Sequence, residues 1–376
     1  MLKLIHRILF VELLGAVGEG VVLFTFVFLL KRLFNLTELL VAGRASMMTT
    51  IELISSLLPS IILLTLPMAV LLATMMVYGR LVQENEFTAL RAVGYSPFQM
   101  LVPAIILGLL LTTLLLWWGH RIAPKGLRIV RETAADVLKN AATAGIRPSQ
   151  FSHLGDMIIS ARGVSGGKMS HLKLFEERDG RIAGVISSPS ASIGYSPQNS
   201  SISFTLDNGR LHQMPHPQRD VLIDFDRMTF SIGIPALLNK FARTGPEEQR
   251  YSGSELTKKA IELRQGFETE TNEKNKRWYF KKAKQMQMEQ SRRYSLPAAA
   301  LIMAVIGALL GMLSGYGKRS SCYGLTILVI FLYYNLMNFG KTMVEDGAIS
   351  PWLGLWTPNF VAGMFAIYLL NRFRRL

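Results

Sequence analysis

The sequence contains several apolar runs long enough to cross a lipid bilayer, and this feature limits the fold most strongly. A helix needs about 20 mainly apolar residues to span the hydrocarbon core. Six stretches fit, at about 9–30, 51–77, 100–118, 295–313, 323–339 and 352–370. Half of all residues (50%) are hydrophobic, which is typical of a chain that crosses the membrane several times. We therefore predict an α-helical membrane protein with six transmembrane helices.

The long middle of the chain has a different pattern. Between Arg121 and Tyr294 no run is long and apolar enough to cross, and residues 146–234 contain short strand-like segments. Turn signals such as Asp179-Gly180 and Asn208-Gly209 separate these segments. We predict an inserted all-β domain of the sandwich or jelly-roll type. Its interior, either a packed core or an apolar groove, should be lined by Phe204, Leu206, Leu211, Phe225 and Phe230.

These patterns divide the chain into four parts. Residues 1–120 hold three spans and a short helix at about 80–95, and residues 121–250 form the β domain. Residues 251–294 are a charged helical return segment that could lie against lipid headgroups, and residues 295–376 hold the last three spans. The positive-inside rule places both termini and the short helix in the cytoplasm and the β domain across the membrane. The residues that set this orientation are Lys3, Arg7, Arg80, Arg91, Lys318, Arg319, Arg372, Arg374 and Arg375.

The stretch from Gly79 to Pro97 is polar and helix-prone and lies between two spans, so it must sit outside the bilayer. Charged and apolar residues alternate in it with roughly the helical period, and Gly94 should end the helix. Such a helix, held at the membrane face, could receive a push from a partner and pass it to the flanking spans. It could equally be a solvated helix that only joins them.

Polar and small residues inside the spans mark three further candidate sites. Glu12, Gly15 and Glu19 share one helix face, which should point into protein or a watery cavity because an intramembrane carboxylate is costly. For Glu19, a functional role and a structural pairing role both remain open. Lys31 and Arg32 end the first span and could be simple interfacial anchors. In the fourth span, a ridge of small residues should allow close helix packing: Gly307, Gly311 and Gly315.

Residues that could carry out chemistry are scarce. Gly166-Gly167-Lys168 resembles the end of a phosphate loop, but Arg162 stands at the first glycine position and Met169 at the hydroxyl position. His212 and His216 have a spacing that suits a metal only on a helix, which the adjacent prolines exclude. The single cysteine, Cys322, excludes a disulfide framework. The net charge of +15 lies largely beside spans and in the return segment, so it does not indicate nucleic-acid binding. We expect no catalytic residue, metal or cofactor.

With three spans, a β insert and three more spans, the chain resembles the LptF/LptG family of lipopolysaccharide-export permeases over nearly its whole length. The most specific matches are the Leu66–Val70 run and the pattern from Glu84 to Gly94, which reads ENEFTALRAVG. The resemblance implies a dimer with a paralogous permease, driven by two copies of a cytoplasmic ATPase that binds and hydrolyses the ATP. It also implies extraction of lipopolysaccharide from the bacterial inner membrane and its delivery to a periplasmic bridge protein with a jelly-roll fold.

Roles for individual residues follow from the same resemblance. Glu84, Glu86, Leu90, Arg91 and Gly94 correspond to the family's coupling helix, which docks on the ATPase, and carboxylates suit pairing with arginines of a moving partner. Lys31 and Arg32 correspond to basic residues that face the lipid cavity and can meet phosphates. The sequence around Lys31 favours LptF over LptG.

Two alternative functions remain open at this stage. One is a mechanotransmission-type permease that moves a periplasmic domain without transporting lipid. The other is a membrane-embedded enzyme acting on lipid, for which Glu19, His212 and His216 are the only candidate residues.

Overall fold

The computed structural model describes residues 2–42, 46–144, 151–154, 157–165, 168–178, 181–196, 201–216, 219–233, 247–270, 272–314 and 319–374. The chain forms two compact units. The helical unit consists of Met1–Leu29, Leu57–Leu127 and Pro246–Leu376, and the β unit consists of Leu30–Ser56 and Arg128–Gly245.

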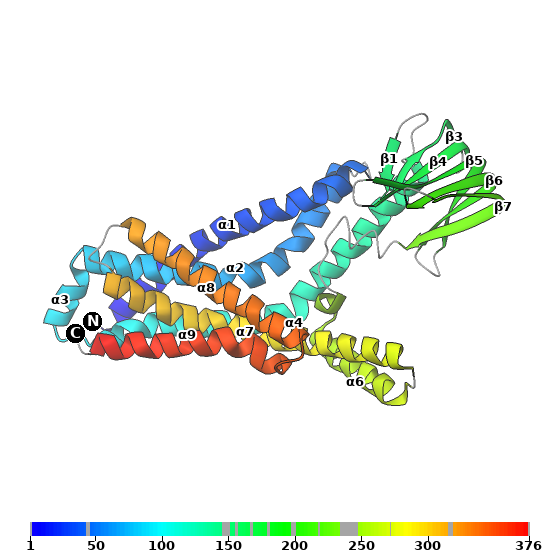
Figure 1. Ribbon diagram of the computed structural model, residues 1–376. Helices are drawn as coiled ribbons and strands as arrows, with labels where there is room; N and C mark the ends of the chain where they lie inside the picture. Colours follow the sequence, from blue (N-terminus) through cyan, green and yellow to red (C-terminus); the bar gives the residue numbers. More distant parts are fainter. Residues whose placement is uncertain are drawn as a thin grey trace. The chain divides into compact units, whose positions relative to one another are not determined.

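The helices follow the order of the predicted spans (Figure 1). They are α1 (Leu2–Ala42), α2 (Met47–Gln83), α3 (Glu86–Ala92), α4 (Pro97–Ala144), the 3-10 helix η1 (Glu247–Arg250), α6 (Gly253–Thr269), α7 (Glu273–Ser314), α8 (Arg319–Glu345) and α9 (Pro351–Arg374). Among the described residues, six helices are long and apolar enough to cross a membrane: α1, α2, α4, α7, α8 and α9. The six expected transmembrane helices are therefore confirmed.

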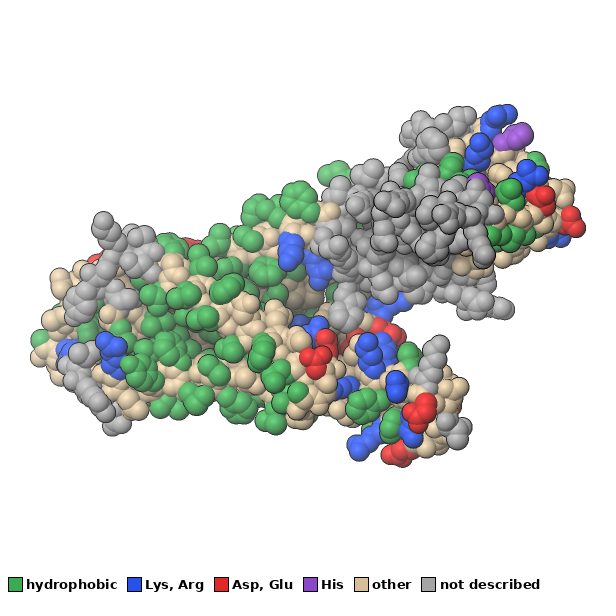
Figure 2. Space-filling view, viewed as in Figure 1, with side chains coloured by type: hydrophobic (Ala, Val, Ile, Leu, Met, Phe, Trp, Pro, Cys, Tyr) green, Lys and Arg blue, Asp and Glu red, His purple; other side chains and the backbone are tan. Residues whose placement is uncertain are grey.

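Helices α2 and α7 form the centre of the helical unit. In their most apolar stretches 78% and 72% of the residues are buried, against 22% in α1 and 17% in α8. Figure 2 shows hydrophobic side chains covering the visible surface of the spans, and charged side chains gathered around the α6 segment. Because a lipid-facing surface must be apolar, the exposed apolar rows of α1, α8 and α9 fit a bilayer environment.

Small residues bring the two central helices together. A Cβ atom on Gly307 would lie 2.7 Å from the carbonyl oxygen of Leu71 and would clash with the hydroxyl of Thr74. A Cβ atom on Gly311 would lie 2.7 Å from the carbonyl oxygen of Met75. The two glycines thus let α7 approach the backbone of α2 closely. Gly315 lies outside the described residues.

Side chains of neighbouring helices donate to carbonyls close to the prolines of α2. Pro59 and Pro67 lie inside this helix, where a proline leaves one carbonyl without its usual partner. The indole of Trp118 donates to the carbonyl of Pro59 at 3.0 Å, and the hydroxyl of Tyr334 donates to the carbonyl of Leu64 at 2.9 Å. These hydrogen bonds join α4 and α8 to α2 near its two prolines.

The β unit contains one antiparallel sheet in the described residues. Its strands are β1 (Phe151–Leu154), β2 (Met157–Ser160), β3 (Gly163–Ser165), β4 (Lys168–Arg178), β5 (Arg181–Ser196), β6 (Ser201–His216) and β7 (Arg219–Gly233). They pair in the order β1-β2-β4-β5-β6-β7, and β3 also pairs with β4. The inserted all-β domain is confirmed. Of the five residues expected inside it, Phe204 and Leu206 are fully buried, and the ring of Phe204 stacks on Phe230 at 5.1 Å.

The prediction of a turn at Asn208-Gly209 is wrong, because strand β6 continues through both residues. Asn208 adopts a left-handed conformation, with φ of 50°, which asparagine tolerates well. Gly209 pairs with Phe225 of β7, and any side chain on Gly209 would collide with the Phe225 ring. Pairing of β6 with β5 and β7 along most of its length outweighs the local turn preference.

Helix α4 continues well beyond the expected end of the third span near residue 120. It reaches Ala144, and the first strand begins at Phe151. The segment contains only Pro124 as an interruption, and Val130, Ala134 and Val137 are buried at helical spacing. The inserted segment therefore opens with a helix before its first strand.

Candidate functional site

Helix α3 is a separate short helix with well-defined ends. Asn85 breaks the chain away from α2 with a left-handed φ of 60°, so the expected continuous helix at 80–95 is divided at Glu84-Asn85. At the other end Gly94 has φ of 87°. The amide of Gly94 donates to Arg91 at 2.9 Å and that of Tyr95 donates to Leu90 at 3.0 Å, which is a Schellman motif. Gly94 thus ends the helix as expected.

One face of α3 is fixed to the rest of the helical unit. Phe87 is buried, and its ring lies 6.0 Å from that of Phe373 near the end of α9. Next to α3, the imidazole of His6 in α1 donates to the carbonyl of Gln99 at 3.0 Å and lies edge-on to Tyr95. Figure 1 shows α3 beside both chain ends. Helix α3 is therefore held against the last span, and the segment that follows it is held against the first span.

The opposite face of α3 is open to solvent. The exposed residues of α3 and its flanks are Glu84, Asn85, Glu86, Thr88, Ala89, Arg91, Ala92, Val93 and Gly94. Val93, directly after α3, has an exposed fraction of 80%. A fixed helix that presents carboxylates and an apolar residue is suited to docking a partner protein.

Arg80, near the end of α2, connects α1 with the α2–α3 junction. Its Nε and Nη2 atoms donate to the two carboxylate oxygens of Glu12 in α1 at 2.8 and 2.7 Å. Its Nη1 atom donates to Glu84 at 2.5 Å and lies 3.5 Å from a carboxylate oxygen of Glu86. The sequence does not indicate the contact between Arg80 and Glu12, because the two residues are 68 positions apart. We call these four residues the Arg80 cluster.

The Arg80 cluster is not electrically balanced. It contains three carboxylates and one guanidinium, and the side chains of Glu84 and Glu86 are 44% and 48% exposed. A cluster of ion pairs attracts a further cation only when its negative charges outnumber its positive charges. The excess of carboxylates therefore favours a basic side chain as the further partner of Glu84 and Glu86.

A cavity of about 360 Å³ adjoins the Arg80 cluster between α1, α2 and α8. As the helical spacing predicted, Glu12, Gly15 and Glu19 all line it, together with Arg80 and Tyr323. Among the residues that the structure describes, Glu19 has no hydrogen-bond or ion-pair partner. The first span thus turns its polar face towards a cavity and not towards lipid.

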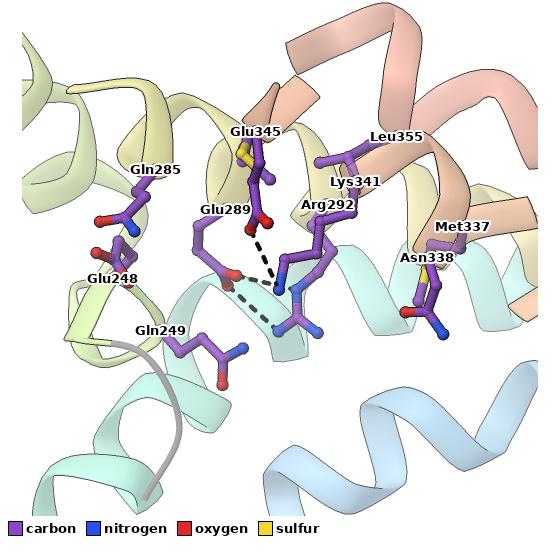
Figure 3. A pocket seen from close by; sticks show the side chains of 11 residues that line it. Glu248, Gln249, Gln285, Glu289, Arg292, Met337, Asn338, Lys341, Glu345 and Leu355 are labelled. Carbon is purple, nitrogen blue, oxygen red and sulfur yellow. Dashed lines mark hydrogen bonds and ion pairs between the residues drawn. The ribbon is translucent and has the colours of Figure 1, made fainter. Parts of the chain in front are cut away.

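A second cavity, of about 210 Å³, lies between η1, α7, α8 and α9 (Figure 3). The buried carboxylate of Glu289 accepts hydrogen bonds from Arg292 at 2.9 Å and from Arg293 at 3.2 Å. Arg293 also donates to the carbonyl of Gln249 in η1 at 3.1 Å. Lys341 pairs with Glu345 at 3.6 Å on the same cavity. These contacts fix the middle of α7, where the predicted return segment continues without a break into the fourth span. Sequence patterns did not indicate this role.

The acidic side chains of η1 pair with Lys282 of α7. Its ammonium group lies 3.0 Å from Glu247 and 2.9 Å from Glu248. Burial raises the pKa of the Glu247 carboxyl, but hydrogen bonds from Lys282 and Tyr251 outweigh this effect, so the pKa lies below its ordinary value. Glu247 therefore remains ionised and keeps η1 attached to α7.

Lys31 and Arg32 lie within a helix and not at its end. Helix α1 continues to Ala42 because this segment has good helix formers and lacks glycine and proline. Lys31 is exposed and Arg32 is half-buried. Both belong to the β unit, whereas the Arg80 cluster belongs to the helical unit.

One sequence arrangement that could suggest chemistry has a structural explanation. Gly163 to Gly167 has the Gly-x-Ser-x-Gly spacing of a nucleophile elbow, although we expected no catalytic motif. Such an elbow needs a sharp turn from a strand into a helix, whereas Ser165 lies in β3 and pairs with Lys168 of β4. Among the described residues, no group of three or more histidine, cysteine or acidic side chains could hold a metal ion.

Comparison with known proteins gives one family. The family model described as "Lipopolysaccharide export system permease LptF/LptG" matches residues 7–372. No curated protein matches the chain.

Proposed function

The chain belongs to the LptF/LptG family of lipopolysaccharide export permeases, and on this premise we propose that it is one half of an ATP-driven transporter. In this proposal it pairs with a paralogous permease in the bacterial inner membrane. Two copies of a cytoplasmic ATPase supply the energy. The complex extracts lipopolysaccharide from the membrane and delivers it to a periplasmic bridge protein.

The main support is the geometry of α3. It is anchored through Phe87, and the carboxylates of Glu84 and Glu86 next to it are exposed to solvent. Arg80 neutralises only part of the negative charge of its cluster. Charge-assisted hydrogen bonds from arginines of an ATPase would satisfy these carboxylates. Because α3 joins α2 to α4, a push on it acts on both spans.

Chain connectivity supports the proposed orientation. Helix α3 lies between α2 and α4, and the β insert follows the other end of α4. When α4 crosses the membrane, α3 and the insert are therefore on opposite sides. With α3 in the cytoplasm, the β domain is periplasmic, where it can pass acyl chains to a bridge protein that also has a β fold.

The transporter needs an external energy source, because release of the bound lipid is unfavourable in free energy. Each buried methylene contributes about 0.8 kcal/mol to binding, so a lipid with several acyl chains is held strongly in an apolar cavity. In our proposal, closure of the ATPase dimer tilts α3, narrows the cavity between the two permeases and expels the lipid towards the periplasm. Lys31 and Arg32 would hold the lipid's phosphates until then.

The test is Glu86→Lys, which reverses a charge on the exposed side of α3. We expect the Glu86→Lys variant to insert into the membrane normally but to lose the ATPase from the purified complex. Glu345→Lys is the matched control, because it makes the same charge change on an exposed residue at the far end of α8 and should retain the ATPase. Co-purification of the ATPase with Glu86→Lys at the control level would refute docking on α3.

A further inference from the structure

We infer that Arg80 is a positioning residue that transmits the movement of α3 to the first transmembrane helix. The inference rests on the proposed function, because it assumes that an ATPase moves α3. It adds a route from α3 through the Arg80 side chain of α2 to α1, a helix that the chain does not connect directly to α3.

The geometry of the guanidinium supports this role. A planar fork that binds a carboxylate through two nitrogen atoms fixes both the distance and the orientation of its partner. Arg80 uses Nε and Nη2 in this way for Glu12, which leaves Nη1 for Glu84 and Glu86. One rigid group therefore holds α1 on one side and the α2–α3 junction on the other. When α3 is displaced, either α1 follows or an ion pair breaks.

The charge balance allows Arg80 to stay in place while a partner docks. Three carboxylates can accept two cations, so a basic side chain of the ATPase can join Glu84 and Glu86 without displacing Arg80. Docking would then add to the cluster and would not open it. The link between α3 and α1 is kept at the moment when force is applied.

The adjoining cavity explains what a movement of α1 would change. Glu12 and Arg80 both line the cavity between α1, α2 and α8, and so does Glu19 further along α1. Few residues of α1 are buried, so this helix has fewer packing contacts that oppose a shift than α2 has. A pull on Glu12 would therefore move α1 relative to α2 and change the width of the cavity.

The experiment uses the complete transporter in vesicles. Variants of this chain are Arg80→Gln, Glu12→Gln and the double variant, with Arg80→Lys to retain the charge without the fork. Three quantities are measured: the amount of co-purified ATPase, the rate of ATP hydrolysis, and the lipopolysaccharide released to the bridge protein per ATP hydrolysed. Lys341→Gln is the matched control, because it removes an exposed ion pair at the other end of the spans.

Arg80→Gln is expected to keep the ATPase and its hydrolysis but to lower release per ATP about tenfold, within the range typical of coupling between sites. Glu12→Gln should act in the same direction. The double variant should be no worse than Arg80→Gln, because residues that work as one unit are not additive. Arg80→Lys should fall in between. Partly exposed ion pairs contribute little to stability, so the variants should still fold.

Two results would overturn the inference. One is unchanged release per ATP in Arg80→Gln with the ATPase bound, which would leave the proposed function intact. The other is an additive loss in the double variant, which would show that Glu12 and Arg80 act separately. Failure of the proposed function looks different, since the wild-type chain itself would then bind no ATPase or release no lipopolysaccharide.

Discussion

The ring of Phe87 in α3 lies 6.0 Å from the ring of Phe373 in α9, and Phe87 is only 5% exposed. This contact joins a helix between the second and third spans to the end of the last span. It makes α3 a fixed part of the helical unit in spite of its length of seven residues. Isolated helices of this length are not stable in water, so tertiary contacts must hold α3 in place.

Replacing Phe87 by alanine should therefore release α3. Removal of a buried phenylalanine side chain typically costs about 3–5 kcal/mol. We expect the amides of residues 86–92 to exchange with deuterium much faster in Phe87→Ala than in the wild type, while α2 and α4 stay protected. Val93→Ala is the control, because Val93 is 80% exposed and its loss should leave the exchange rates unchanged. Slow exchange in Phe87→Ala would show that other contacts hold α3.

The close approach of α2 and α7 predicts a strong effect of a single methyl group. In Gly307→Ala the new Cβ would meet the carbonyl oxygen of Leu71 at 2.7 Å. Overpacking of this kind typically costs about 1–3 kcal/mol, so the midpoint of thermal unfolding in detergent should fall. Gly363→Ala in α9 is the control, since nothing lies within 4 Å of its added Cβ. Equal midpoints for the two variants would contradict tight packing at Gly307.

The buried ion pairs at the second cavity predict a difference between two glutamates. Glu289→Gln would leave Arg293, whose side chain is 2% exposed, without its charged partner. Removing one member of a buried pair costs about 3–5 kcal/mol, so unfolding should occur at a clearly lower temperature. Glu345→Gln breaks the exposed pair with Lys341 and should change stability by no more than about 0.5 kcal/mol. Similar losses in both variants would mean that burial does not set the strength of these pairs.

Lys31 and Arg32 give the most direct test of lipid contact. The variant with Lys31→Asp and Arg32→Asp should lose most of its photocrosslinking to lipopolysaccharide, because carboxylates repel the phosphates that the basic residues attract. The crosslinker is placed at a neighbouring position of α1 that is not changed. Lys341→Asp makes a similar charge change on α8 and should leave the yield unaffected. An unchanged yield in the double variant would make the two residues simple interfacial anchors.

The sequence alone determined the features that depend on local pattern. The length of the apolar runs was sufficient to place six membrane helices, because each helix must satisfy its own backbone hydrogen bonds within the bilayer. Gly94, followed by Ser96-Pro97, correctly predicted the end of α3, because glycine adopts the left-handed conformation of a helix C-terminus without steric cost. The pattern from Glu84 to Gly94 led to the family, which the match to residues 7–372 establishes.

Only the tertiary structure decided which distant residues meet. The pairing of Glu12 with Arg80 joins positions 68 apart, and no local preference specifies such a contact. The passage of β6 through Asn208-Gly209 depended on two neighbouring strands, which outweighed a local turn signal. In both cases the stabilising contacts join residues that only the folded chain brings together. Local sequence patterns therefore do not predict them.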